Sequence, residues 1–132
     1  MPLTLQQAER MLQAAKAKAL EMGIKVSIGV VDSRGDLMAM VRLDGARWYT
    51  PEVCRGKAFA SATWGQPSSE LMERADHPVF RGISMMQSGR LIPAKGALPI
   101  LEGGEILGAI GVSGGTADQD VEVAQAGLDA LR

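Results

Sequence analysis

Two apolar runs, Ala97-Leu-Pro-Ile-Leu101 and Glu105-Ile-Leu-Gly-Ala-Ile-Gly-Val-Ser113, flank the short segment Glu102-Gly103-Gly104. Paired glycines between two apolar runs are typical of a β-hairpin, because tight hairpin turns need the positive φ angles that glycine adopts without strain. This stretch therefore predicts two neighbouring antiparallel strands in the last third of the chain.

A second hairpin is predicted nearer the start of the chain. The segment Lys25-Val-Ser-Ile-Gly-Val-Val-Asp32 is rich in β-branched residues, and the polar turn Ser33-Arg-Gly-Asp36 separates it from the apolar segment 37–43. Strands that come in hairpins, without strand–helix–strand crossovers, favour an antiparallel sheet.

Helices are predicted around these hairpins. Thr4 and Gln7 have the spacing of a capping box, and apolar residues recur every three or four positions up to Gly23, which predicts a helix over residues 5–22. The start signal Thr50-Pro51-Glu52 predicts a second helix over residues 51–63, and residues 118–131 have an amphipathic pattern. A short helical turn is expected over residues 70–75. The secondary structure of residues 79–96 stays open.

The length and composition fit one domain. The chain has 132 residues, of which 46% are hydrophobic and 22% charged, values ordinary for a single globular core. We therefore expect one α+β domain over residues 1–132, with a central antiparallel sheet flanked by helices.

Charge and composition exclude several classes of protein. Fourteen Lys and Arg against fifteen Asp and Glu give a net charge of −1, so no strong positive field predicts nucleic-acid binding. No apolar run approaches the roughly 18–20 residues of a membrane span, and no signal sequence is recognisable, so we expect a cytoplasmic protein with no membrane partner. One cysteine, Cys54, and one histidine, His77, rule out multi-cysteine and two-histidine metal motifs, and no metal site is expected.

A few residues could carry chemistry. His77 could shuttle a proton or ligate haem iron, although a lone histidine before a proline is more often a loop residue. Cys54 is more often a buried helix residue than a nucleophile. Gly108 and Gly111 lie inside a predicted strand, which indicates close approach by another backbone or by a ligand. Cations near the turns could pair with carboxylates or haem propionates: Arg42, Arg47, Arg55, Lys57, Arg90 and Lys95.

The sequence resembles the GlcG/HbpS-like family, also called the haem-degrading domain, which includes the C-terminal domain of PduO-type proteins. The resemblance spans nearly the whole chain in the family's order. It rests on these strings: Val30-Val-Asp-Ser-Arg-Gly-Asp-Leu37, Arg42-Leu-Asp-Gly-Ala46, Gly56-Lys-Ala58, Pro99-Ile100, Gly108-Ala-Ile-Gly-Val-Ser-Gly114, Asp120 and Ala124-Gln-Ala-Gly127.

The resemblance implies a profilin-like or PAS-like α+β fold with a sheet of about five strands and assembly into homo-oligomers. Some members bind haem and are linked to iron release or redox sensing, whereas others are encoded beside catabolic genes. It also implies a set of ligand-binding residues: Asp32, Arg42, Lys57, Gly96, Pro99 and Ser113. The chain departs from the family at Ala97, where a second glycine often follows Gly96.

Three hypotheses about function follow. The first is a protein that binds haem or a related tetrapyrrole, with propionates held by Arg42 or Lys57 and an axial ligand from His77 or Tyr49. The second is an enzyme or accessory protein that acts on a small carboxylate metabolite, again held by Arg42 and Lys57. The third is an oligomeric module without a ligand. No catalytic residue is identified, so enzymatic activity stays open, and haem is the candidate cofactor.

Overall fold

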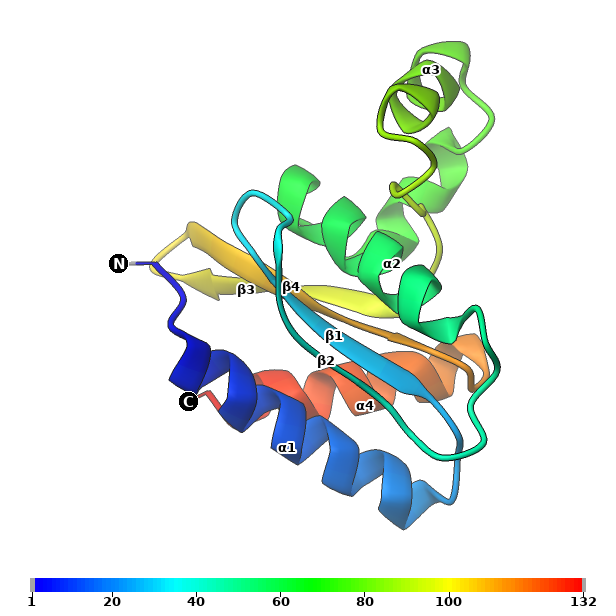
Figure 1. The fold of residues 1–132 in the computed structure, drawn as a ribbon. Coiled ribbons are helices and arrows are strands. Elements are labelled where there is room, and N and C mark those ends of the chain that lie inside the picture. Colours follow the sequence, from blue (N-terminus) through cyan, green and yellow to red (C-terminus); the bar gives the residue numbers. More distant parts are fainter. Residues whose placement is uncertain (1, 132) are drawn as a thin grey trace.

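The computed structural model describes residues 2–131 and shows one antiparallel sheet between two layers of helices (Figure 1). The sheet has four strands in the order β2-β1-β4-β3. The strands are β1 Ser27–Asp32, β2 Leu37–Arg42, β3 Ala97–Glu102 and β4 Glu105–Ser113. Both predicted hairpins are confirmed. The expected count of about five strands is wrong, because the open segment 79–96 forms a helix and an irregular connection and adds no strand.

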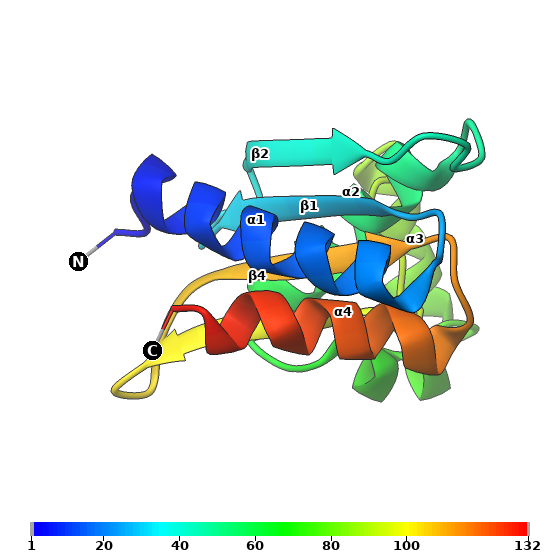
Figure 2. The same ribbon diagram turned by 90° about the horizontal axis from the view of Figure 1, so that it is seen from below.

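Helices α1 Leu5–Met22 and α4 Ala117–Asp129 lie side by side on one face of the sheet (Figure 2). Capping boxes at Thr4 and Thr116 begin them, and the first of these was predicted from the sequence. The main core lies between these helices and the sheet, with Met11, Ile28 and Ile110 fully buried.

Helix α2 Thr50–Trp64 covers the opposite face and lies very close to strand β4. A Cβ atom on Gly111 would lie 2.3 Å from the carbonyl oxygen of Cys54 and 2.9 Å from the amide nitrogen of Ala58. Any side chain at this position would push α2 away from the sheet. Of the two explanations for Gly111, close approach by backbone therefore accounts for it without a ligand.

Residues 66–95 project from the body of the domain on the side of the sheet that α2 covers (Figure 1). They contain the 3₁₀ helix η1 Ser68–Arg74 and helix α3 Pro78–Met86. A second, smaller core joins this segment to α2 through Phe59, Leu71, Phe80 and Leu91. The predicted helical turn is confirmed as η1, and α3 fills much of the segment left open by the sequence.

Among the described residues, none of the helices combines the length and the apolar character needed to cross a membrane.

Candidate functional site

Lys57, one of the predicted ligand residues, is buried in an ion pair. Its Nζ atom lies 3.2 Å from Asp120 Oδ2 and donates a hydrogen bond of 3.0 Å to the carbonyl oxygen of Val112. The other carboxylate oxygen of Asp120 accepts a hydrogen bond from Gly115 N–H. Burial raises the pKa of Asp120, and the Lys57 charge opposes that rise. The ion pair joins α2 to the start of α4. The contacts with Asp120 and Val112 explain why Lys57 is buried, without a ligand.

Gly96 and Ser113 lie close to this ion pair. A Cβ atom on Gly96 would lie 2.7 Å from the carbonyl oxygen of Val112 and 2.8 Å from Lys57 Nζ, and its φ angle is +142°. Ser113 is buried at the end of β4. The structure thus brings Lys57, Gly96 and Ser113 together, in a tightly packed region where the ammonium group already has partners.

Arg42 and Tyr49 lie elsewhere, near the edge of the sheet. Arg42 is exposed at the end of β2 and donates from Nη1 to the carbonyl oxygen of Ala46. Together with Lys16 and Lys25 it borders a groove of about 480 Å³. Tyr49 is 41% exposed and packs edge to face against Trp48. Arg42 and Lys57 therefore do not share one polar pocket.

Asp32 stabilises the turn of the first hairpin. Its Oδ1 atom accepts hydrogen bonds from the backbone N–H groups of Arg34 and Asp36, at 2.9 and 3.1 Å. A short polar side chain that bonds to the backbone two residues ahead is a common turn device. This role explains the aspartate at the start of the turn.

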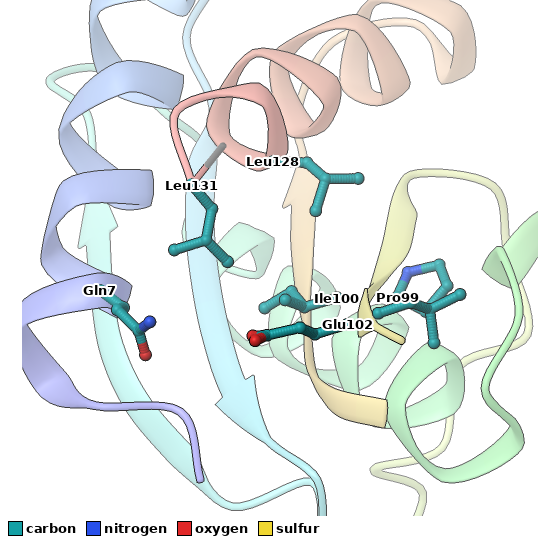
Figure 3. A pocket seen from close by; sticks show the side chains of 7 residues that line it. Gln7, Pro99, Ile100, Glu102, Leu128 and Leu131 are labelled. Atoms are coloured by element: carbon teal, nitrogen blue, oxygen red, sulfur yellow. The ribbon is translucent and has the colours of Figure 1, made fainter. Parts of the chain in front are cut away.

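Pro99 lines a groove of about 510 Å³ between β3 and the two helices α1 and α4. Figure 3 shows Leu128 of α4 and Leu131, which follows this helix, near Ile100 and Pro99, with Gln7 of α1 across from them. Glu102 brings a carboxylate to this groove. An anionic ligand would be repelled there, so this groove does not suit haem propionates or a small carboxylate.

His77 begins helix α3 and lies in a small, mostly apolar pocket. Its Nδ1 atom accepts a hydrogen bond of 3.2 Å from the N–H group of Val79, which makes it the N-cap of the helix. The pocket, here called the α3 pocket, has a volume of about 340 Å³ and is lined by Arg74, His77, Val79, Phe80 and Ile83. It combines a metal-ligating side chain, an apolar wall and a cation.

An apolar stripe extends the α3 pocket along the helix. Val79, Ile83 and Met86 are spaced by four and three positions, so they share one face of α3. Val79 is 64% exposed and Met86 is 80% exposed. Exposed apolar side chains gathered on one face, beside a pocket, are typical of a binding surface.

Cys54 is buried in α2 and unsuited to nucleophilic chemistry. Burial raises the pKa of its thiol to about 12, against a smaller lowering by the Lys57 charge. The expectation that Cys54 is a core residue is confirmed. Over residues 2–131 no three His, Cys, Asp or Glu side chains form a group able to hold a metal ion.

The family model of haem-degrading, HbpS-like proteins matches residues 3–129. The chain belongs to this family.

Proteins similar to this chain match it over nearly its whole length. An uncharacterized 15.0 kDa protein of Citrobacter freundii, from the dhaT-dhaS intergenic region, is 34% identical over 96% of this chain and 90% of its own length. The crystal structure of Klebsiella pneumoniae protein ORFY has a TM-score of 0.89 at 31% identity, covering 98% of this chain and 90% of that one. The PduOC:heme complex has a TM-score of 0.87 at 23% identity, covers 98% of this chain and 95% of that one, and shows the shared fold.

Several residues of the α3 pocket were missed by the sequence analysis. Val79, Phe80 and Ile83 were not candidates, because the segment that holds them had no assigned structure. Arg74 lies in the predicted helical turn, but nothing in the sequence placed it beside His77. The order His77-Pro78 was a usable signal: an N-cap acceptor followed by proline at the first helical position is typical of a helix start. A helix from that point would have placed Val79 and Ile83 on one face with His77 at its end.

Proposed function

We propose that the protein binds haem or a related tetrapyrrole at the α3 pocket. The observation that carries the proposal is the position of the only histidine of the chain, beside an apolar wall and Arg74. A flat apolar ring with acidic side groups needs these three features together. A haem complex of PduOC, which shares the fold, supports the same ligand class.

The size and exposure of the α3 pocket fit partial burial of such a ring. Its volume of about 340 Å³ is at the lower end of the roughly 300–1,000 Å³ range of ligand sites. Phe80 and Ile83 would supply the apolar wall for the bound ring, and the stripe that ends at Met86 would cover more of it. The Arg74 guanidinium would pair with a propionate. When bound, haem supplies a redox-active iron, which suits a protein that handles haem or iron or senses redox state.

If His77 ligates iron, it can no longer accept the hydrogen bond by which it caps helix α3. As the N-cap it accepts a hydrogen bond at Nδ1, so a neutral ring carries its proton on Nε2. Ligation through Nε2 requires the proton on Nδ1, and the bond from Val79 N–H is then lost. Loss of an N-cap costs about 0.5–2 kcal/mol, so ligation and full capping of α3 compete.

The test is a haem titration followed in the Soret region with four variants. His77→Asn keeps a side-chain acceptor for the cap but is a poor iron ligand, and His77→Ala removes both functions. Arg74→Gln removes the propionate partner. Arg10→Gln removes an exposed cation on α1, outside the α3 pocket, and serves as the matched control. We expect saturable binding in the wild type and in Arg10→Gln, with at least about tenfold weaker binding in both His77 variants.

Two negative outcomes test different parts of the proposal, namely the identity of the ligand and the location of its site. If the wild-type spectrum shows no saturable change, haem is not the ligand. If His77→Asn and His77→Ala bind as the wild type does, with unchanged spectra, the α3 pocket is not the site.

A small carboxylate with an apolar body is the second candidate ligand. The groove beside Arg42 is lined by the apolar residues Leu20, Ile24 and Val41, and by the cations Lys16 and Lys25. One carboxylate, Asp44, also lines it, but three cations outnumber it there, whereas Glu102 faces no cation in the groove beside Pro99. Cations beside apolar side chains suit such a ligand. Calorimetric titration with benzoate as the probe tests this groove, and Arg42→Ala is expected to abolish any heat of binding.

A further inference from the structure

The groove beside Pro99, here called the β3 groove, has no part in the proposed function. It is lined by Gln7 of α1, residues 99–102 of β3, Leu128 of α4 and Leu131, and its volume is about 510 Å³. The α3 pocket belongs to the segment that packs on α2, at the other face of the sheet. Small-molecule sites have volumes of roughly 300–1,000 Å³. The β3 groove is therefore a second candidate site, separate from the α3 pocket.

The charge of the β3 groove comes from Glu102. Among the described residues that line the groove, no other side chain is ionisable. In Figure 3 the Glu102 side chain extends from β3 toward Gln7 of α1. Within the described part of the chain no lysine or arginine forms an ion pair with it. The carboxylate is thus available to a cationic group of a ligand.

The other polar side chain of the β3 groove is already engaged. Gln7 Oε1 accepts a hydrogen bond of 2.9 Å from Thr4 N–H, as part of the capping box of α1. This bond leaves the Nε2 group of Gln7, which is a donor, to face a ligand. Among the side chains of the groove, Glu102 is therefore the acceptor for a ligand ammonium group.

The backbone at this edge of the sheet adds a further acceptor. The Ser68 hydroxyl bonds to both the N–H and the C=O of Ala97, which are outward groups of the edge strand β3. Outward and inward residues alternate along an antiparallel strand, so the carbonyl group of Pro99 also points outward. Proline has no N–H group with which to bind an anion. Carbonyl and carboxylate oxygens favour a ligand that donates hydrogen bonds.

The rest of the β3 groove is apolar. Ile100 is fully buried, and Leu128 and Leu131 are half-buried and pack against the main core. Leu101 beside them is 52% exposed. An apolar ligand body would remove this surface from water, which is favourable. A ligand without a cationic group would cover the Glu102 carboxylate without supplying a counter-ion, which is unfavourable.

We propose that the β3 groove binds an organic amine, with its ammonium group on the Glu102 carboxylate and its apolar body against Leu128 and Leu131. Neither the α3 pocket nor the groove beside Arg42 suits this ligand class, because cations line both. The two faces of the sheet would then select ligands of opposite charge.

The test is a titration of the full chain followed in two-dimensional amide NMR spectra, with three probes of similar size. Phenethylamine is a cation at neutral pH, phenylpropionate is an anion, and phenethyl alcohol is uncharged. We expect saturable shifts from phenethylamine at residues 99–102 and 128–131. The dissociation constants of the other two probes should be at least about tenfold higher.

Substitutions at Glu102 test the role of its charge. Glu102→Gln keeps the size of the side chain and should weaken phenethylamine binding at least about tenfold. Glu102→Lys should reverse the preference, so that phenylpropionate binds more tightly than phenethylamine. Glu9→Gln is the matched control, because Glu9 is an exposed carboxylate of α1 outside the β3 groove. Its affinities should equal those of the wild type.

Three results would overturn the proposal. The first is a wild type without saturable shifts from phenethylamine at the β3 groove. The second is equal affinity for phenethylamine and phenylpropionate, which requires no variant. The third is a Glu102→Gln protein that keeps a folded spectrum and binds phenethylamine as the wild type does. None of these readouts involves haem.

Discussion

Burial raises the pKa of the Cys54 thiol and the charge of Lys57 lowers it, and the effect of burial is the larger. The pKa of the folded thiol is about 12, against 9.0 for an ordinary one. Between pH 9 and 12 the thiol therefore ionises in the unfolded chain but not in the folded one. The unfolded state then binds fewer protons, so the free energy of unfolding falls as pH rises, by up to about 1.4 kcal/mol per pH unit.

This difference predicts a pH dependence that Cys54→Ala should lack. The stability contributed by the neutral thiol is fully present below pH 9 and is lost as pH rises towards 12. Urea unfolding at pH 8, 9, 10 and 11 measures it, because all other titrating groups are shared by the wild type and the variant. We expect the two free energies to diverge above pH 9, and parallel curves would show that the thiol ionises equally in both states.

For single residues, the sequence indicated which positions have a specific role better than it indicated what that role is. Asp32, Gly96 and Lys57 were candidates for ligand contact. In the structure, Asp32 stabilises a turn and Lys57 forms a buried ion pair. Gly96 lies so close to the backbone of Val112 that a side chain would not fit. Their roles depend on neighbours distant in the sequence: Lys57 contacts Asp120, which lies 63 positions further along the chain. Sequence spacing carries no information about such a contact.

Among the elements, the junction of α2 with α4 depends on one ion pair. Removing either partner leaves the other charge buried without its counter-ion, which costs about 3–5 kcal/mol. We therefore expect Lys57→Met and Asp120→Asn each to destabilise the protein by about that amount. The double variant keeps an oxygen to accept from Gly115 N–H and buries no charge, so its loss should be well below the sum of the two.

A double-mutant cycle in urea unfolding measures this coupling. A coupling energy near zero would mean that the two side chains stabilise the protein independently.

Elements with strong local signals were predicted well. Helix α1 has a capping box, a regular apolar face and a glycine in the left-handed conformation at its end, and its predicted range, 5–22, agrees with the observed one. The hairpins have recognisable turns between apolar strands, a polar turn with one glycine in the first and paired glycines in the second. Helix α3 lacked such a pattern, because it has nine residues and only Phe80 is buried. A helix that short depends on contacts with η1 and α2, which the local sequence does not reveal.

On the scale of the whole molecule, two cores of unequal size predict unequal local stability. The larger core joins the sheet to α1 and α4, whereas α3 is tied to α2 through the smaller cluster around Phe80. Segments with few buried apolar contacts open without global unfolding. We expect the amides of α3 to exchange with deuterium much faster than those of β1 and β4.

Hydrogen–deuterium exchange with mass spectrometry measures this difference. Added haem should slow exchange in α3 if the α3 pocket is its site. Equal protection of α3 and the central strands in the free protein would show that the two cores open as one unit.

The Ser68 hydroxyl occupies the outward N–H and C=O groups of Ala97, at the start of the edge strand β3. A foreign strand that approached this edge would find those two groups already hydrogen-bonded, and Pro99 offers it no N–H group. Because unpaired strand edges template aggregation, Ser68 protects the beginning of β3 against the addition of a further strand.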